Sequence, residues 1–250
     1  MTGLYLYDGG FQGLLTVLRV LRETGAEPAD IRADASALQA SLLDDEVRVK
    51  TDAARAERFS REVCERISPG ALRRAFRAFL SEEDGAEYAI YRYLRLGWEV
   101  GDSVDAHVGD EYVHAVRGMS RRTGHEAHRM QGLLRFRQLQ GGLFYAPMRT
   151  RCDVLCLVAR HFLGRMGDQD WMIHDLGREQ AALCSGGELG FVSLPEFDPL
   201  LSEGELTCQE MWRDYFRNIA VRERRNPRLQ RSLMPMRYWH LLVEEPGVSP

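Results

Sequence analysis

The chain has 250 residues, 44% of them hydrophobic and 28% charged, with a net charge of −4, and this profile is typical of a globular protein with a substantial core. No apolar run approaches the ~20 residues that cross a bilayer, and the N-terminus lacks the basic and apolar pattern of an export signal. The five cysteines are odd in number and scattered, which argues against a secreted disulfide framework, so we expect a cytoplasmic protein that does not enter a membrane.

The first half of the chain is predicted to be largely helical. Residues 4–7 alternate like a short strand and stop at the turn Asp8-Gly9-Gly10, residues 47–49 favour another short strand, and residues 32–43 are ambiguous. Apolar residues at helical spacing predict helices over much of the remainder, one of them capped by Ser68 and beginning at Pro69. The other helices are expected over residues 11–21, 53–67 (capped by Thr51 or Asp52), 87–99 and 111–130.

The second half changes character and is predicted to contain a small sheet. Residues 133–139 and 143–148 read as two strands of a hairpin that turns at Gln140-Gly141-Gly142. Helical periodicity returns over residues 152–166 and in a long amphipathic helix over 206–225, which ends at Asn226-Pro227. Further short strands are expected over residues 171–175, 180–184 and 189–194.

These elements predict an α+β fold with a helical N-terminal half, a mostly antiparallel small sheet in the second half and a C-terminal amphipathic helix. We expect one domain over residues 1–250, which could subdivide into a helical part at 1–108 and a sheet-containing part at 109–250. The apolar residues of the last helix are expected to pack into the core. They are Trp212, Tyr215, Phe216 and Ile219.

The charges are distributed unevenly along the chain. Residues 119–165 hold nine arginines against two acids, and residues 212–237 hold eight arginines against two acids, whereas the remainder is strongly acidic. Two basic segments on an acidic body are typical of a protein that binds a polyanion such as nucleic acid. The alternative is that each arginine pairs with an acid from elsewhere in the fold.

The most suggestive basic stretch is Leu134-Arg135-Phe136-Arg137. Strand alternation places the two arginines on one face, with Arg129 on the preceding helix and the aromatic Tyr145 on the next strand beside them. Such a surface suits phosphate contacts and base stacking, although an ordinary half-exposed strand has the same pattern. The residues that we expect to bind nucleic acid are Arg129, Arg135, Arg137, Tyr145, Arg213, Arg217, Arg224 and Arg228.

A second set of residues carries candidate chemistry. His125-Glu126-Ala127-His128 resembles the start of a zinc-protease motif, but its histidines are three residues apart rather than four, so it fails on spacing. Asp168 and Asp175 lie beside the first basic segment, and carboxylates can perform acid–base work there. The catalytic candidates are therefore His125, His128, Asp168 and Asp175, against the alternative that they serve in turns and packing. We predict no metal site and no cofactor.

Several motifs, taken in order, resemble those of one known family. They are Tyr7-Asp8-Gly9-Gly10-Phe11-Gln12-Gly13, His125-Glu126-Ala127-His128-Arg129-Met130 with Leu134-Arg135-Phe136, Gly142-Leu143-Phe144-Tyr145-Ala146, Arg160-His161-Phe162, Asp168-Gln169 with Trp171 and His174-Asp175, and Asn226-Pro227-Arg228 with Tyr238-Trp239. The chain thereby resembles the bacterial "probable DNA metabolism protein" family, which is linked to a radical SAM protein and also occurs fused to uracil-DNA-glycosylase-type domains. The resemblance is to the stand-alone form.

The resemblance implies a role in DNA repair or modification. Together with the basic segments, it predicts a DNA-binding accessory protein whose partner, a radical SAM enzyme, does the chemistry. An iron–sulfur cluster would belong to that partner, because this chain lacks three closely spaced cysteines. The alternatives are a nuclease-like or base-processing enzyme that uses the histidines and aspartates, with or without a metal, and a scaffold that docks proteins without touching DNA.

Overall fold

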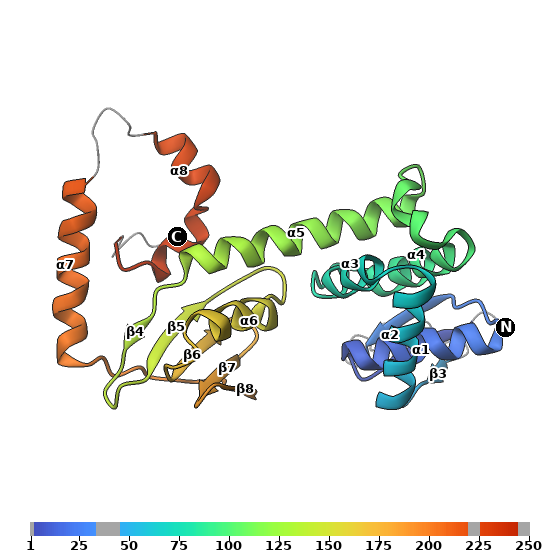
Figure 1. Ribbon diagram of the computed structural model, residues 1–250, viewed down its shortest axis with the longest axis horizontal. Helices are drawn as coiled ribbons and strands as arrows, with labels where there is room; N and C mark the ends of the chain where they lie inside the picture. The colour runs from blue at the N-terminus through green and yellow to red at the C-terminus, as the bar shows by residue number, and fades with distance from the viewer. Residues whose placement is uncertain (1–2, 34–45, 220–225, 245–250) are drawn as a thin grey trace. The chain divides into compact units, whose positions relative to one another are not determined.

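The computed structural model describes residues 3–33, 46–219 and 226–244 and divides the chain into two compact units, residues 1–124 and 125–250 (Figure 1). The boundary falls inside helix α5 (Glu111–Leu133), whereas the sequence suggested a subdivision after residue 108. Among the described residues, no helix is both long enough and apolar enough to span a membrane.

The first unit contains a three-stranded parallel sheet. Strand β1 (Leu4–Tyr7) lies in the centre, between β2 (Asp30–Ala33) and β3 (Glu46–Arg48). All four residues of β1 are buried, and Tyr5 pairs with Ile31 on one side and Val47 on the other. The two short strands expected in this half are therefore confirmed, and β2 is an addition. Most of the ambiguous segment 32–43 lies outside the described residues.

Besides the first part of α5, the described residues of the first unit form four helices and a 3-10 turn. They are α1 (Phe11–Thr24), α2 (Ala53–Arg66), α3 (Pro69–Phe79), α4 (Ala86–Val100) and η2 (Gly101–Ala106). The predicted caps are confirmed, because the Asp52 and Ser68 side chains each accept a backbone N–H bond of 3.0 Å at the start of α2 and α3. Local hydrogen bonding thus fixes where these helices begin.

The Asp8-Gly9-Gly10 turn and the start of α1 pack closely together. A Cβ atom at Gly13 would lie 2.1 Å from Asp8 Oδ1 and 2.8 Å from Tyr7 Cδ2, so only glycine fits there. Asp8 Oδ2 in turn accepts a 2.6 Å bond from the Thr51 hydroxyl, just before α2. The motif at the start of the chain is therefore explained by packing in the first unit.

The second unit contains a five-stranded sheet of order β4-β5-β6-β7-β8. Its strands are β4 (Arg137–Gln138), β5 (Phe144–Met148), β6 (Trp171–Asp175), β7 (Gln180–Ser185) and β8 (Glu188–Ser193). Only β5 and β6 are parallel, and α6 (Leu155–Arg165) connects them. The α+β fold with a mostly antiparallel sheet in the second half is therefore confirmed.

The two faces of this sheet have different cores. Trp171 and Ile173 of β6 face α6 and pack in a cluster with Val158, whereas Met172 lies on the opposite face with Tyr145. This alternation follows from the twofold period of a strand. Every residue of β6 is buried, as expected for a strand that is covered on both faces.

The prediction of a strand over residues 133–139 is wrong for most of these residues. Helix α5 continues to Leu133, and the Leu134 amide still donates a 3.0 Å bond to the Met130 carbonyl, so this stretch completes a helix. Only Arg137 and Gln138 pair with β5. Arg135 is therefore not in a strand, and the prediction that strand alternation places Arg135 and Arg137 on one face is wrong.

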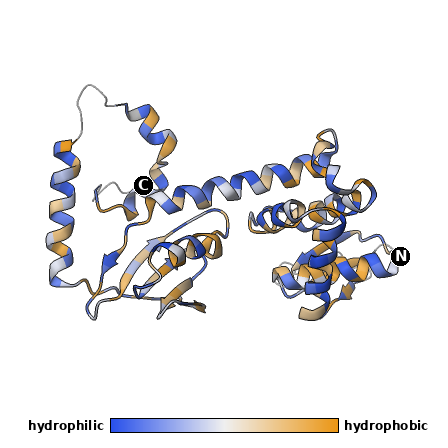
Figure 2. Cartoon of the chain, viewed as in Figure 1, coloured by the Kyte–Doolittle hydropathy of each residue, from blue (hydrophilic) through white to orange (hydrophobic). Residues whose placement is uncertain are grey.

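The C-terminal region consists of α7 (Glu203–Ile219), α8 (Pro227–Leu233) and η4 (Met236–Leu241). Residues 220–225 of the predicted long helix lie outside the described residues. The expectation that the apolar residues of α7 are core is wrong: no residue of this fully described helix is buried, and Trp212 and Tyr215 are 41% and 54% exposed. Figure 2 shows hydrophobic residues of α7 among hydrophilic ones along its length.

Candidate functional site

A dense polar network lies where the parallel strands β5 and β6 end. Their last residues, Met148 and Asp175, are paired in the sheet, and residues 149–152 leave β5 at this edge on the way to α6. The carboxyl ends of parallel strands are where α/β proteins commonly place a binding site, because the connecting loops diverge there. We refer to residues 149–152 as the β5 loop.

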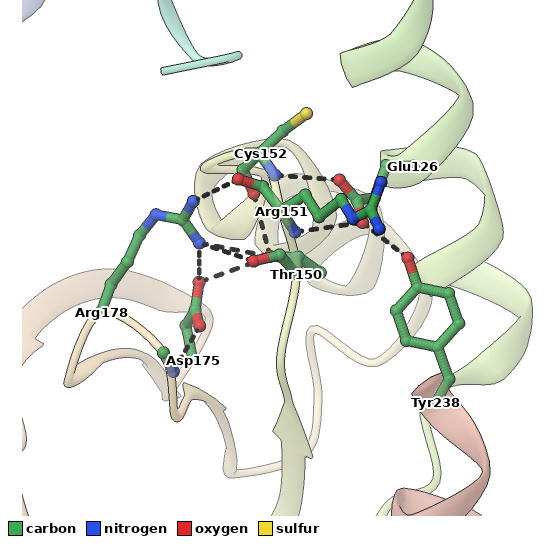
Figure 3. A network of polar contacts seen from close by, with 8 residues as sticks. Glu126, Thr150, Arg151, Cys152, Asp175, Arg178 and Tyr238 are labelled. Carbon is green, nitrogen blue, oxygen red and sulfur yellow. Dashed lines mark hydrogen bonds and ion pairs between the residues drawn. The ribbon is translucent and has the colours of Figure 1, made fainter. Parts of the chain in front are cut away.

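Glu126 of α5 holds the β5 loop from one side (Figure 3). Its carboxylate is buried and accepts backbone N–H bonds from Arg151 at 3.1 Å and Cys152 at 2.9 Å. The Tyr238 hydroxyl donates a 2.6 Å bond to the same carboxylate, and Arg237 lies 3.2 Å from it. The loop amides are thus bonded to a carboxylate that also has Tyr238 and Arg237 as partners.

The protonation states of this pair follow from the same contacts. Burial by itself raises the pKa of Glu126, but the bonds from Tyr238 and the two loop amides outweigh it and leave that pKa below its ordinary value. Burial and the adjacent Glu126 charge raise the pKa of Tyr238 to about 12. At neutral pH, Glu126 is therefore an anion and Tyr238 a hydrogen-bond donor.

Asp175 and Arg178 hold the β5 loop from the other side (Figure 3). Asp175 is completely buried, and its Oδ2 atom lies 2.9 Å from Arg178 Nη1. Arg178 Nη2 donates a 2.9 Å bond to the Arg151 carbonyl, and Arg178 Nη1 also reaches the Thr150 carbonyl at 3.3 Å. The N–H groups of the loop are thus bonded to Glu126, and its carbonyls are bonded to Arg178, which Asp175 holds in place.

This network presents Arg149 and Arg151 to solvent. Both residues are exposed, and neither forms an ion pair with an acid in the part of the chain that the structure describes. Arg178 and Arg237 add positive charge next to them, although their own partners are the buried acids. The loop is therefore a rigid backbone with two available guanidinium groups, which suits the binding of a phosphate or carboxylate.

Two of the arginines that the sequence assigned to a nucleic-acid surface, Arg135 and Arg213, form bonds within the second unit. Arg135 forms a two-pronged ion pair with Glu244, with Nε 3.0 and 3.1 Å from the two carboxylate oxygens, and the Glu244 side chain is only 3% exposed. Arg213 Nε donates a 3.1 Å bond to the Val243 carbonyl. These two arginines fasten the segment that follows η4.

Arg137 and Tyr145 are also engaged inside the unit. Arg137 Nη2 donates a 3.0 Å bond to the Leu241 carbonyl, and burial lowers the pKa of this guanidinium. Tyr145 is 3% exposed, and its hydroxyl lies 3.1 Å from Nδ1 of His174. Its ring is not available for stacking on a base, contrary to the expectation from the sequence.

The remaining predicted arginines are more accessible. Arg217 is exposed on α7 beside Asp214 at 3.5 Å, Arg228 is exposed on α8, and Arg129 is half-buried on α5. Arg224 lies outside the described residues. The structure therefore does not gather the seven described residues of this set into one surface.

The four catalytic candidates are likewise not assembled. His125 and His128 are exposed on α5, and Asp175 is committed to Arg178. Asp168 lies in the turn before β6 and Asp175 is the last residue of this strand, so the two approach the sheet from opposite ends of β6. Among the described residues, no group of three or more His, Cys, Asp or Glu side chains is placed to hold a metal ion.

Glu126, the residue between the two histidines, was not among the predicted site residues. A signal for it exists in the sequence, because Met119, Thr123, Glu126 and Met130 follow the helical spacing of the buried face of α5. A carboxylate at a core position requires buried donors around it. The structure supplies them from the β5 loop and Tyr238.

Comparison with known proteins adds family membership. No curated protein matches the chain. The family model DUF4130, described as a domain of unknown function, matches residues 84–244, which is more than half of the chain and includes Glu126, the β5 loop, Asp175 and Tyr238. The chain belongs to the DUF4130 family.

Proposed function

We propose that this protein is a DNA-binding accessory protein in DNA repair or modification, and that the β5 loop contacts the phosphate backbone. The observation that carries the proposal is the pair of exposed arginines, Arg149 and Arg151, on a loop fixed by Glu126 and by Asp175 with Arg178. Phosphate groups recognise fixed guanidinium groups through charge-assisted hydrogen bonds.

The rigidity of the loop supports this assignment on energetic grounds. A flexible loop loses conformational entropy when a ligand orders it, at roughly 1–2 kcal/mol for each residue whose backbone becomes fixed. Here the Arg151 and Cys152 amides and the Thr150 and Arg151 carbonyls already have partners, so little ordering remains to be done. The exposed Arg217 and Arg228 would add weaker, longer-range attraction.

The partner in this proposal is a radical SAM enzyme, as the resemblance to the DNA metabolism family implies. That enzyme would contain the iron–sulfur cluster and perform the reaction, while this chain holds the nucleic acid. The scattered positions of the five cysteines support this division, because such a cluster requires three closely spaced thiolates.

The proposal is tested by fluorescence anisotropy with labelled single- and double-stranded DNA over a salt series. The variant is Arg149→Ala/Arg151→Ala, and the matched control is Arg58→Ala/Arg61→Ala, which removes two exposed arginines from α2 in the other unit. Each phosphate contact contributes about 0.9 to the slope of log K against log salt on duplex DNA, so the loop variant should lose roughly two units of slope. The control should retain the slope of the wild type.

Two results would overturn the assignment. Equal losses in the loop variant and the control would show that only the total charge matters. No binding of either DNA at low salt would remove the DNA role and favour the docking scaffold, which predicts binding to the radical SAM partner that salt does not weaken.

A further inference from the structure

The first unit contains a cavity that the proposed DNA contact does not use. It has a volume of about 190 Å³ and lies between α1, α2 and α4. Its floor is apolar and consists of Leu18, Leu21, Phe59 and Leu94, each at most 3% exposed. This volume is below the roughly 300–1,000 Å³ of pockets that bury drug-sized molecules, so the cavity suits a ligand with one or two fused rings.

Aromatic side chains shape the wall of the cavity. The Trp98 and Phe59 rings pack edge to face, with centroids 5.9 Å apart, and the Arg22 guanidinium lies over the Trp98 ring, 3.5 Å from its centroid. Tyr91 stands on the same helix as Trp98 and also lines the cavity. Flat walls of this kind favour a planar ligand that stacks or packs edge-on.

The rim of the cavity is polar and offers both donors and acceptors. Glu27 is ion-paired with Arg95 and accepts a 3.3 Å bond from the Tyr91 hydroxyl. A carboxylate has about four lone-pair positions, so these two contacts leave Glu27 able to accept further bonds. Burial and the Glu27 charge raise the pKa of Tyr91, which keeps its hydroxyl protonated at neutral pH.

We infer that this cavity binds the base of a nucleotide. A nucleobase has two apolar faces for the floor and the aromatic wall, and a polar edge with N–H donors for Glu27 and acceptors for Arg95. Arg95 faces the base edge, so the nucleotide phosphate is complementary to the other arginine of the rim, Arg22. An aliphatic ligand would leave this polar rim without partners, and an organic cation would face two arginines.

The site is separate from the β5 loop, so nucleotide binding here neither requires nor follows from DNA binding there. Trp98 is the one tryptophan of residues 1–124, and its indole N–H signal in a ¹⁵N NMR spectrum is assigned by its loss in Trp98→Phe. The probes are AMP, GMP, CMP and UMP, each titrated into the full-length protein. Ribose 5-phosphate serves as the probe without a base.

We expect at least one nucleotide to shift the Trp98 signal in a saturable manner, while ribose 5-phosphate leaves it unchanged. Ala26→Phe fills the cavity from its rim and should abolish the shift, and Glu27→Gln should weaken binding about tenfold, in line with a lost bond to a charged group. Glu57→Gln, an exposed carboxylate on α2, is the matched control and should bind as the wild type does.

The inference is overturned if no nucleotide moves the Trp98 signal at millimolar concentration, or if ribose 5-phosphate moves it equally. It is also overturned if Ala26→Phe, shown to be folded by its circular dichroism and by unchanged backbone amide signals of first-unit residues away from the cavity, binds nucleotides like the wild type. The Arg149→Ala/Arg151→Ala variant should retain nucleotide binding. Loss of DNA binding and loss of nucleotide binding are therefore distinguishable.

Discussion

Replacing Glu126 with glutamine should destabilise the second unit by about 2–3 kcal/mol. Glutamine keeps the size of the side chain but replaces one carboxylate oxygen by an NH₂ group, which faces donors from the loop amides or the Tyr238 hydroxyl. Hydrogen bonds to charged groups contribute about 1.5–3 kcal/mol, and a buried donor without a partner costs about 1–3 kcal/mol. The estimate assumes that one such bond is lost and that the others weaken.

The measurement is urea denaturation followed by tryptophan fluorescence in a Trp98→Phe background, in which all remaining tryptophans lie in the second unit. With a slope of roughly 1–3 kcal/mol per molar urea, the midpoint should fall by about 1–2 M. Glu196→Gln is the control, because Glu196 is exposed in the loop after β8. Its substitution should change the free energy of unfolding by less than about 0.5 kcal/mol.

The pH dependence gives this prediction a second, independent test. The pKa of Glu126 is lower in the folded protein than the ordinary value of 4.5, so its contribution to stability is complete above that value and is lost as the pH falls through the folded-state pKa. The difference between the wild type and Glu126→Gln should therefore be largest at pH 7 and should shrink in acid. A difference that stays constant from pH 7 to pH 3 would refute the reasoning, as would a loss below about 0.5 kcal/mol at pH 7.

Three further outcomes are expected. Tyr238→Phe should cost about 1–2 kcal/mol in urea denaturation, because it removes one donor to Glu126. The 295 nm absorbance of the wild type minus that of Tyr238→Phe isolates this residue among the nine tyrosines and should rise only near pH 12, and a rise of this difference near pH 10 would contradict the bond. Glu244→Gln should lower the free energy of unfolding by about 3 kcal/mol or more and accelerate proteolysis of the C-terminal segment, because Arg135 then loses its buried partner. It should leave the salt dependence of DNA binding unchanged, and an altered slope would assign Arg135 to the DNA surface after all. Gly13→Ala should lower the thermal midpoint by several degrees, because its Cβ would collide with Asp8 and Tyr7, and an unchanged midpoint would show that this turn relaxes freely.

The parts of the fold that local forces determine were predictable from the sequence. The caps at Asp52 and Ser68 each need only a side-chain oxygen and an amide three residues away. The strand over residues 171–175 also followed from local pattern, and β6 has those bounds. The failures involve distant partners: Arg135 looked like a surface residue because Glu244, which neutralises it, lies 109 positions away.

Helix α7 illustrates a different limit of periodicity. Its apolar residues repeat at helical spacing, which indicates a helix, and the helix is present. The same pattern does not say whether that face meets the core of its own unit, and Trp212 and Tyr215 instead stack on each other at 5.7 Å and stay exposed. Periodicity thus establishes the type of element, while burial depends on what the rest of the chain brings to it.

In the basic segment at residues 119–165, pairing with distant acids and binding of a polyanion are not exclusive interpretations, because they apply to different arginines. Arg122 is paired with Glu83 and Arg135 with Glu244, so for these arginines the acids from elsewhere in the fold are the explanation. Arg149 and Arg151 lie in the same segment, but the buried acids nearest to them, Glu126 and Asp175, are occupied by backbone amides, Tyr238 and Arg178. Acids that anchor the loop backbone leave Arg149 and Arg151 without an ion pair among the described residues, and because of this separation of roles we propose the β5 loop, rather than residues 134–137, as the place where an anion binds.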